Sequence, residues 1–172
     1  MSAVLKRISL LLPLLLIAFM VKGQLRYVKD MNQVKTGVTS SLQGIGGYFE
    51  YNYFLNRGLA LGGNLDYEQS RIGTTDYEEF RFTGELKYNL KMWENAFING
   101  YLGLAGEVMS LQSRVEDKSK NEVLFGNNVG VEFEYYVFKN IGITLRAGQR
   151  IFYIKSQTSY LNTRLGVSYS FY

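Results

Sequence analysis

Apolar and polar residues alternate along the last stretch of the chain, Leu161–Tyr172. Its odd-numbered positions hold leucine, valine, tyrosine and phenylalanine, with Thr163 as the exception, and its even-numbered positions hold mainly asparagine, arginine, glycine and serine. Successive side chains of a β-strand point to opposite faces. The pattern therefore predicts a strand with one apolar face and one polar face.

Seven earlier segments alternate in the same way, so we expect eight strands. The seven are Val34–Thr39, Gly47–Leu55, Leu59–Glu68, Glu79–Leu90, Ile98–Val108, Val123–Val137 and Ile141–Ile151. The last strand ends on aromatic residues, as the closing strand of an outer-membrane barrel does. The expected fold class is all-β: an eight-stranded antiparallel transmembrane β-barrel.

The connections between these segments alternate in character. Those after the second, fourth and sixth strands are short, such as Asn56–Gly58 and Lys91–Asn95, and the second of these carries Trp93. Those after the odd-numbered strands are polar and mostly longer, such as Ser70–Asp76 and Gln112–Glu122. Short periplasmic turns and longer external loops are typical of outer-membrane barrels.

Charged residues lie on the polar faces of the expected strands, and both signs occur. Besides Lys35, they are Glu50, Asp66, Glu68, Glu79, Arg81, Glu85, Lys87, Glu107, Glu132, Glu134, Arg146, Arg150 and Arg164. The apolar faces include four glycines, at positions 63, 84, 100 and 106. Glycines would leave unfilled volume in a packed soluble core, whereas lipid tolerates them. The pattern favours a transmembrane barrel over a soluble lipocalin-like barrel.

The inward charges have three interpretations. Eight strands enclose a space just wide enough for side chains to fill, which favours a salt-bridge network that plugs the barrel. A proton or ion path and a catalytic carboxylate pair, such as Asp66 with Glu68 or Glu132 with Glu134, are the alternatives. We expect these carboxylates to pair with the arginines of the last two strands, Arg146, Arg150 and Arg164.

The beginning of the chain reads as a targeting segment. Residues 1–23 combine a basic start with an apolar run and are predicted to be a cleaved signal peptide. Residues 24–33 are expected to be a periplasmic lead-in, and residues 34–172 the barrel. Three of the 19 basic residues belong to the signal peptide, so the remaining chain is close to neutral and gives no reason to expect nucleic-acid binding.

Composition narrows the chemistry further. The chain has no histidine and no cysteine, which removes Ser–His and Cys–His catalysis and histidine-based metal sites. No glycine-rich phosphate loop occurs. We therefore predict no enzymatic activity, no cofactor and no small-molecule substrate. The aromatic run Tyr48, Phe49, Tyr51, Tyr53 and Phe54 is interpreted as interfacial girdle residues rather than a base-stacking platform.

Three segments resemble one known family. They are LGGNLDYEQS, then TGELKYNL followed by a short turn and AFINGYLGLAGEV, and finally LGVSYSF. In this order they resemble the conjugative-transposon TraO proteins of Bacteroidota, which are small exported β-barrel proteins. The resemblance covers about Val34–Tyr172, although the chain has Tyr172 one position past Phe171 where that family more usually ends on an in-phase phenylalanine.

That resemblance implies a non-enzymatic outer-membrane component of a conjugal DNA-transfer apparatus. Its implied partners are outer-membrane lipid and other proteins of the apparatus. The alternatives are a general OmpX-like surface or envelope barrel, acting in adhesion or envelope integrity, and a narrow pore.

Overall fold

The chain forms a closed β-barrel in the computed structural model, which describes residues 27–41, 44–72, 75–113, 119–153 and 158–172. Within these ranges eight antiparallel strands each pair with their sequence neighbours, and β1 pairs with β8. The strands are β1 (Asn32–Ser41), β2 (Ile45–Phe54), β3 (Leu59–Ile72), β4 (Thr75–Met92), β5 (Ala96–Ser113), β6 (Ser119–Tyr136), β7 (Ile141–Phe152) and β8 (Thr158–Phe171). The predicted eight-stranded antiparallel barrel is confirmed. No helix within the described ranges is long and apolar enough to cross a membrane.

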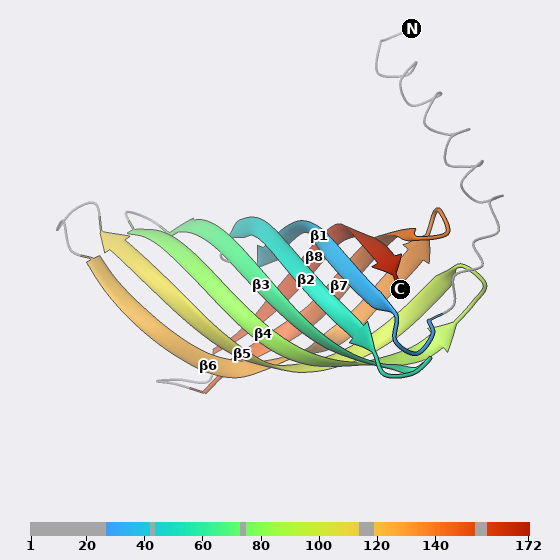
Figure 1. Cartoon of the computed structure of the whole chain (residues 1–172). Coiled ribbons are helices and arrows are strands. Elements are labelled where there is room, and N and C mark those ends of the chain that lie inside the picture. Colours follow the sequence, from blue (N-terminus) through green and yellow to red (C-terminus); the bar gives the residue numbers. More distant parts are fainter. Residues whose placement is uncertain (1–26, 42–43, 73–74, 114–118, 154–157) are drawn as a thin grey trace, which may run out of the picture.

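The last strand closes the barrel as its alternation predicts. Val34 and Val38 of β1 lie opposite Tyr169 and Leu165 of β8. The start of β1 and the end of β8 therefore lie together at one end of the barrel (Figure 1). That end also holds the connections β2–β3, β4–β5 and β6–β7, and we call it the turn end; the opposite end is the loop end.

The strands are longer at the loop end than the alternation predicts. β3 runs to Ile72 and β4 begins at Thr75, so most of the predicted loop Ser70–Asp76 is strand. The predicted loop Gln112–Glu122 is likewise strand at both ends, and residues 114–118 lie outside the described residues. Both predictions were wrong in extent, because paired backbones continue where both faces are polar and the alternation has disappeared.

The start of the barrel also differs from the prediction. β1 begins at Asn32, two residues before the predicted start at Val34, and Asn32 and Gln33 pair with Tyr53 and Asn52 of β2. The sequence pattern missed these two residues because neither is apolar. Residues 27–31, part of the predicted periplasmic lead-in, place Tyr27 and Met31 in the buried interior. The predicted signal peptide, residues 1–23, lies outside the described residues.

The two faces of the barrel wall carry opposite chemistry. Large apolar side chains cover the outside, including Leu104, which is 75% exposed, and Leu145 and Val131 on neighbouring strands. Soluble proteins rarely expose contiguous apolar patches beyond a few hundred Å². This exterior fits a hydrocarbon surrounding, and the polar groups of the wall face inward.

Candidate functional site

The barrel interior gathers the charged residues. All thirteen of the residues singled out above are buried, and so is Lys35. Among the described residues the interior holds eight carboxylates and six basic side chains. These charged residues divide into three groups along the barrel axis. An apolar cluster lies between them and the turn end.

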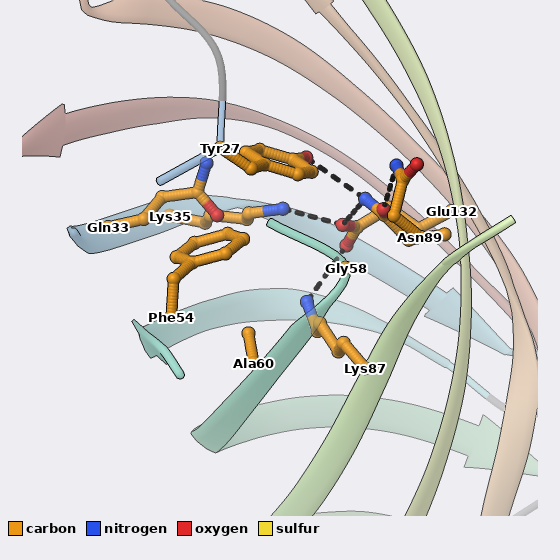
Figure 2. Close-up of a pocket in the computed structure, with 10 residues that line it drawn as sticks. Tyr27, Gln33, Lys35, Phe54, Gly58, Ala60, Lys87, Asn89 and Glu132 are labelled. Atoms are coloured by element: carbon orange, nitrogen blue, oxygen red, sulfur yellow. Dashed lines mark hydrogen bonds and ion pairs between the residues drawn. The ribbon is translucent and has the colours of Figure 1, made fainter. Parts of the chain in front are cut away.

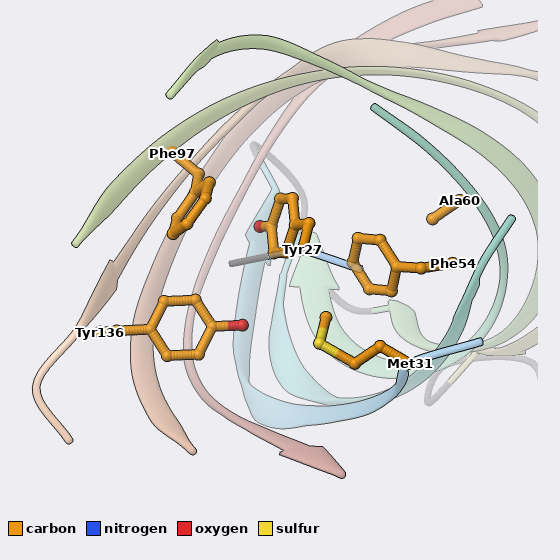
Figure 3. Close-up of a cluster of buried hydrophobic side chains, with 6 residues drawn as sticks. All are labelled: Tyr27, Met31, Phe54, Ala60, Phe97 and Tyr136. Carbon is orange, nitrogen blue, oxygen red and sulfur yellow. The ribbon is translucent and has the colours of Figure 1, made fainter. Parts of the chain in front are cut away.

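The apolar cluster fills the barrel at the turn end (Figure 3). Tyr27 packs its ring 4.5 Å from that of Phe54 and 4.2 Å from that of Phe97, measured between centroids. Its hydroxyl donates a hydrogen bond to Glu134. Burial raises the pKa of the Tyr27 hydroxyl well above its usual value, and the Glu134 carboxylate raises it further. The segment before β1 therefore plugs this end of the barrel.

The girdle interpretation holds for only part of the aromatic run on β2. Phe49 and Tyr51 are exposed on the outer face. Phe54 is buried in the apolar cluster, and Tyr48 lies inside, where its ring faces the Arg164 guanidinium at 5.1 Å. The interpretation was wrong for Tyr48 and Phe54, because the inward positions of the strand use aromatic rings to fill the lumen.

Two lysines organise the first charged group, directly above the apolar cluster (Figure 2). The Lys35 ammonium lies 2.6 Å from a Glu132 carboxylate oxygen and 3.3 Å from Glu134. Lys87 binds Glu132 at 3.2 Å and also pairs with Glu50. A small cavity of about 10 Å³ lies among them, close to the space of a single water molecule. The expected arginine partners of Glu132 and Glu134 are thus replaced by lysines.

The second group, in the middle of the barrel, rests on two arginines. Arg146 donates to Glu85 at 2.9 Å and to Glu50 at 3.0 Å. Arg164 donates to Asp66 at 2.7 Å and lies 3.6 Å from Glu50. Glu50 therefore links this group to the lysines of the first group, since it also pairs with Lys87.

Arg81 is the centre of the third group, toward the loop end. Its guanidinium lies 2.5 Å from Glu107, 3.1 Å from Glu79, 3.5 Å from Glu68 and 3.6 Å from Asp66. Arg150 lies 3.1 Å from Glu68 on the other side. Asp66 and Glu68 are thus engaged by arginines, two of which, Arg150 and Arg164, belong to the last two strands as expected.

This arrangement is a filled interior. Each carboxylate of the two candidate pairs is bound by at least one ammonium or guanidinium group, so both pairs belong to the ion-pair network. Within the described ranges, no group of three or more acidic side chains is placed to hold a metal ion. The charges tie the strands together across the lumen, and their mutual pairing offsets the large cost of removing them from water.

Inward glycines make room for a tyrosine that the sequence did not single out. The Tyr101 ring stacks on the Arg146 guanidinium at 3.4 Å. A Cβ atom at Gly148 would lie 1.8 Å from the Tyr101 hydroxyl oxygen, and one at Gly130 would lie 2.4 Å from it. Tyr101 pairs with Gly130, which in turn pairs with Gly148. An inward aromatic residue beside inward glycines was visible in the sequence, but the register that joins them was not.

Replacing Gly148 by alanine should destabilise the barrel by about 1–3 kcal/mol, the usual effect of overpacking. The new methyl group would meet the Tyr101 hydroxyl, which is held between Arg146 and the wall. Gly84→Ala is the matched control, because nothing lies within 4 Å of a Cβ at that outward position. Equilibrium unfolding by urea in lipid vesicles measures the free energy of unfolding of both variants. Equal stability of the two variants would contradict the packing described here.

Comparisons with known proteins agree on the fold alone. No protein-family model matches the sequence, and no curated protein matches it. The N-terminal β-barrel domain of Pseudomonas aeruginosa OprF is similar with a TM-score of 0.69 and 14% identity, over 84% of this chain and 100% of that one. The attachment invasion locus protein Ail of Yersinia pestis is similar with a TM-score of 0.61 and 14% identity, over the same shares. The outer membrane protein OprG from Pseudomonas aeruginosa has a TM-score of 0.69 and 9% identity, over 86% and 98%.

Proposed function

We propose that this chain is a non-enzymatic outer-membrane β-barrel that acts by binding a partner protein at the cell surface. The apolar exterior and the polar, filled interior support the membrane location, because in lipid only closed barrels and helices satisfy every backbone group. The solved barrels of similar fold include proteins titled as outer-membrane proteins, which supports the same location. The plugged lumen favours a contact function over a narrow pore.

A protruding sheet at the loop end carries this proposal. β3, β4, β5 and β6 continue past their neighbours: β2 pairs with β3 only as far as Gln69, and β7 pairs with β6 only from Gly126. Residues 119–124 of β6 pair with β5, whereas the pairing of β6 with β7 begins only at Gly126. A strand edge of this kind offers backbone donors and acceptors to a strand of another protein.

The sequence resemblance adds a more specific setting, a conjugal DNA-transfer apparatus in which the partner is another protein of the apparatus. Nothing in the fold depends on that setting. A general surface barrel is the second candidate, since one solved barrel of similar fold is titled an attachment invasion locus protein. Both functions would use the same protruding sheet. They are therefore distinguished by whether deletion of the gene reduces mating or surface adhesion.

The experiment is a deletion strain complemented from a plasmid, with mating efficiency, surface adhesion and detergent sensitivity measured in parallel. A complementable loss of mating with an intact envelope would support the transfer role. Unchanged mating with a loss of adhesion would replace that role by surface attachment. If neither mating nor adhesion changed, the proposal of a partner-binding barrel would be wrong.

Removal of residues 113–121 should leave a folded barrel that no longer complements the deletion. The segment lies beyond the last β6–β7 pair, Gly126 with Phe152, so the closed part of the barrel stays intact. Heat-modifiable gel migration checks folding, and the mating and adhesion assays check function. Failure of the shortened chain to insert would mean that the protruding sheet is needed for assembly.

A further inference from the structure

The buried charges of the interior do not balance, and the excess lies toward the loop end. In the first and second groups four carboxylates face four cations, namely Glu50, Glu85, Glu132 and Glu134 against Lys35, Lys87, Arg146 and Arg164. The third group has four carboxylates for two guanidinium groups, namely Asp66, Glu68, Glu79 and Glu107 against Arg81 and Arg150. Asp66 also pairs with Arg164, but the third group keeps an excess carboxylate even if Asp66 is counted with the second group.

Glu79 has the weakest compensation of the four carboxylates in the third group. It is 5% exposed, and its ion pair within the described residues is a 3.1 Å contact between Oε2 and the Arg81 guanidinium. Its other oxygen, Oε1, is buried and has no hydrogen-bond partner in the described part of the chain. By contrast, Asp66 and Glu68 each pair with two arginines, and Glu107 lies 2.5 Å from Arg81.

The register surrounds Glu79 with other carboxylates. It lies directly opposite Glu68 of β3, and like charges directly opposite each other in a sheet repel. On its other side it pairs with Met109 of β5, and Glu107 is the next inward residue of that strand. Glu122 of β6 lies opposite Met109 on the same inner face. Three neighbouring strands therefore present an acidic side chain to this part of the lumen.

The cations near Glu79 are engaged elsewhere as well. Arg81, on the same strand, contacts all four carboxylates of the third group. Arg150 of β7 lies 3.1 Å from Glu68, and the residue opposite it on β8 is Tyr160, which adds no positive charge. A buried carboxyl group with too little compensating charge takes up a proton, because the neutral form avoids both the desolvation cost and the repulsion.

Glu79 also lies at the base of the protruding sheet. Its partner Glu68 directly precedes Gln69, the last residue of β3 that pairs with β2. Arg81 contacts carboxylates of β3 and β5, and Arg150 reaches from β7 to Glu68. These contacts join the base of the protruding sheet to the opposite wall. A change of charge at Glu79 therefore acts where the sheet leaves the closed barrel.

We propose that Glu79 holds a proton at neutral pH and that this proton keeps the base of the protruding sheet packed. When the pH rises and the proton leaves, Glu68 and Glu107 repel Glu79 and the sheet loosens. An exposed glutamate of the unfolded chain is already ionised at neutral pH, so the folded barrel binds the extra proton and its stability in this region falls as the pH rises. Control of partner binding by pH would rest on the proposed function, whereas the proton itself does not.

Hydrogen exchange of the full chain in lipid vesicles, read by mass spectrometry at about pH 6.5 and about pH 8.5, tests the proposal. After correction for the intrinsic effect of pH, wild-type amides of strands β4 and β5 next to Glu79 should exchange faster at the higher pH, by up to about tenfold per pH unit for one proton. Glu79→Gln imitates the protonated carboxyl group and should show no such increase. Glu78→Gln is the matched control, because Glu78 is the preceding residue and exposed, and it should behave like the wild type.

Two exchange results would overturn the proposal: a wild type that does not respond to pH, and a Glu79→Gln variant that responds as the wild type does. Heat-modifiable gel migration reports folding. Failure of Glu79→Gln to fold would overturn the proposal as well, since glutamine has the shape and charge of the protonated side chain. No partner protein is present in this test. An unchanged deletion strain would contradict the proposed function and leave the proton on Glu79 unaffected.

Discussion

Replacing Leu145 by arginine is expected to prevent the barrel from assembling in a bilayer. Leu145 is 54% exposed on the outer face and pairs with Phe133 and Leu165, which are outward apolar residues themselves. An arginine on the lipid face costs about 2–4 kcal/mol near the bilayer midplane. Since folded proteins are stable by only about 5–15 kcal/mol, this is a large part of the total. Folding into vesicles, followed by heat-modifiable migration, measures the effect.

The matched control is Gln149→Arg, four residues further along the same face of β7. Gln149 bonds Ser159 on the outer surface, so this position near the loop end of β7 already carries a polar side chain. An arginine there is expected to cost only about 0–1 kcal/mol, because its head group reaches the interface. Val131→Arg on β6 should behave like Leu145→Arg, since Val131 is also outward and exposed. Normal assembly of both Leu145→Arg and Val131→Arg would mean that the outer face of β6 and β7 does not contact lipid.

The sequence predicts the wall of the barrel well, because the polarity of each side chain indicates whether it lies on the inner or the outer face. The alternation along Leu161–Tyr172 places Arg164 inside and Leu165 outside, and the structure agrees at both positions. The same reasoning puts all thirteen charged candidates on the inner face, where they are buried. Alternation is a local property with a period of two residues, so it needs no knowledge of which strands are neighbours.

Partner identities could not be predicted, because they depend on geometry across the lumen. Lys35 on β1 binds Glu132 on β6, a strand that is not its neighbour in the sheet. Strand tilt and register decide which long side chains meet in the middle, and neither is encoded by alternation. The sequence therefore identifies the buried charges of Glu132 and Glu134 but assigns them to arginines, where the structure has lysines.

The plug at the turn end was missed for a related reason. Tyr27 and Met31 belong to a short irregular segment, so no period marks them as inward, and Asp30 between them takes the left-handed conformation with φ of 66°. Their burial is decided by the space left by Phe54, Phe97 and Tyr136 inside the closed barrel. A segment that fills a space can only be recognised once that space is known.

Replacing Arg81 by methionine is expected to destabilise the barrel by about 3–5 kcal/mol, the usual effect of removing one partner from a buried ion pair. Arg81 is buried and lies within 4 Å of four carboxylates, which would be left facing one another without it. Methionine keeps much of the side-chain volume. The loss of stability is therefore due to the missing positive charge and not to a cavity. Urea unfolding in vesicles at neutral pH measures the change.

Two further variants separate the buried network from salt bridges in general. Arg71 also pairs with a carboxylate, Asp76 at 2.6 Å, but it is 62% exposed at the loop end, so Arg71→Met should cost only about 0–1 kcal/mol. Adding Glu107→Gln to Arg81→Met removes the carboxylate nearest to the lost guanidinium and should restore part of the stability. If Arg81→Met cost no more than Arg71→Met, the interior would have to be hydrated enough to screen its charges. The network would then fill the lumen without holding the strands together.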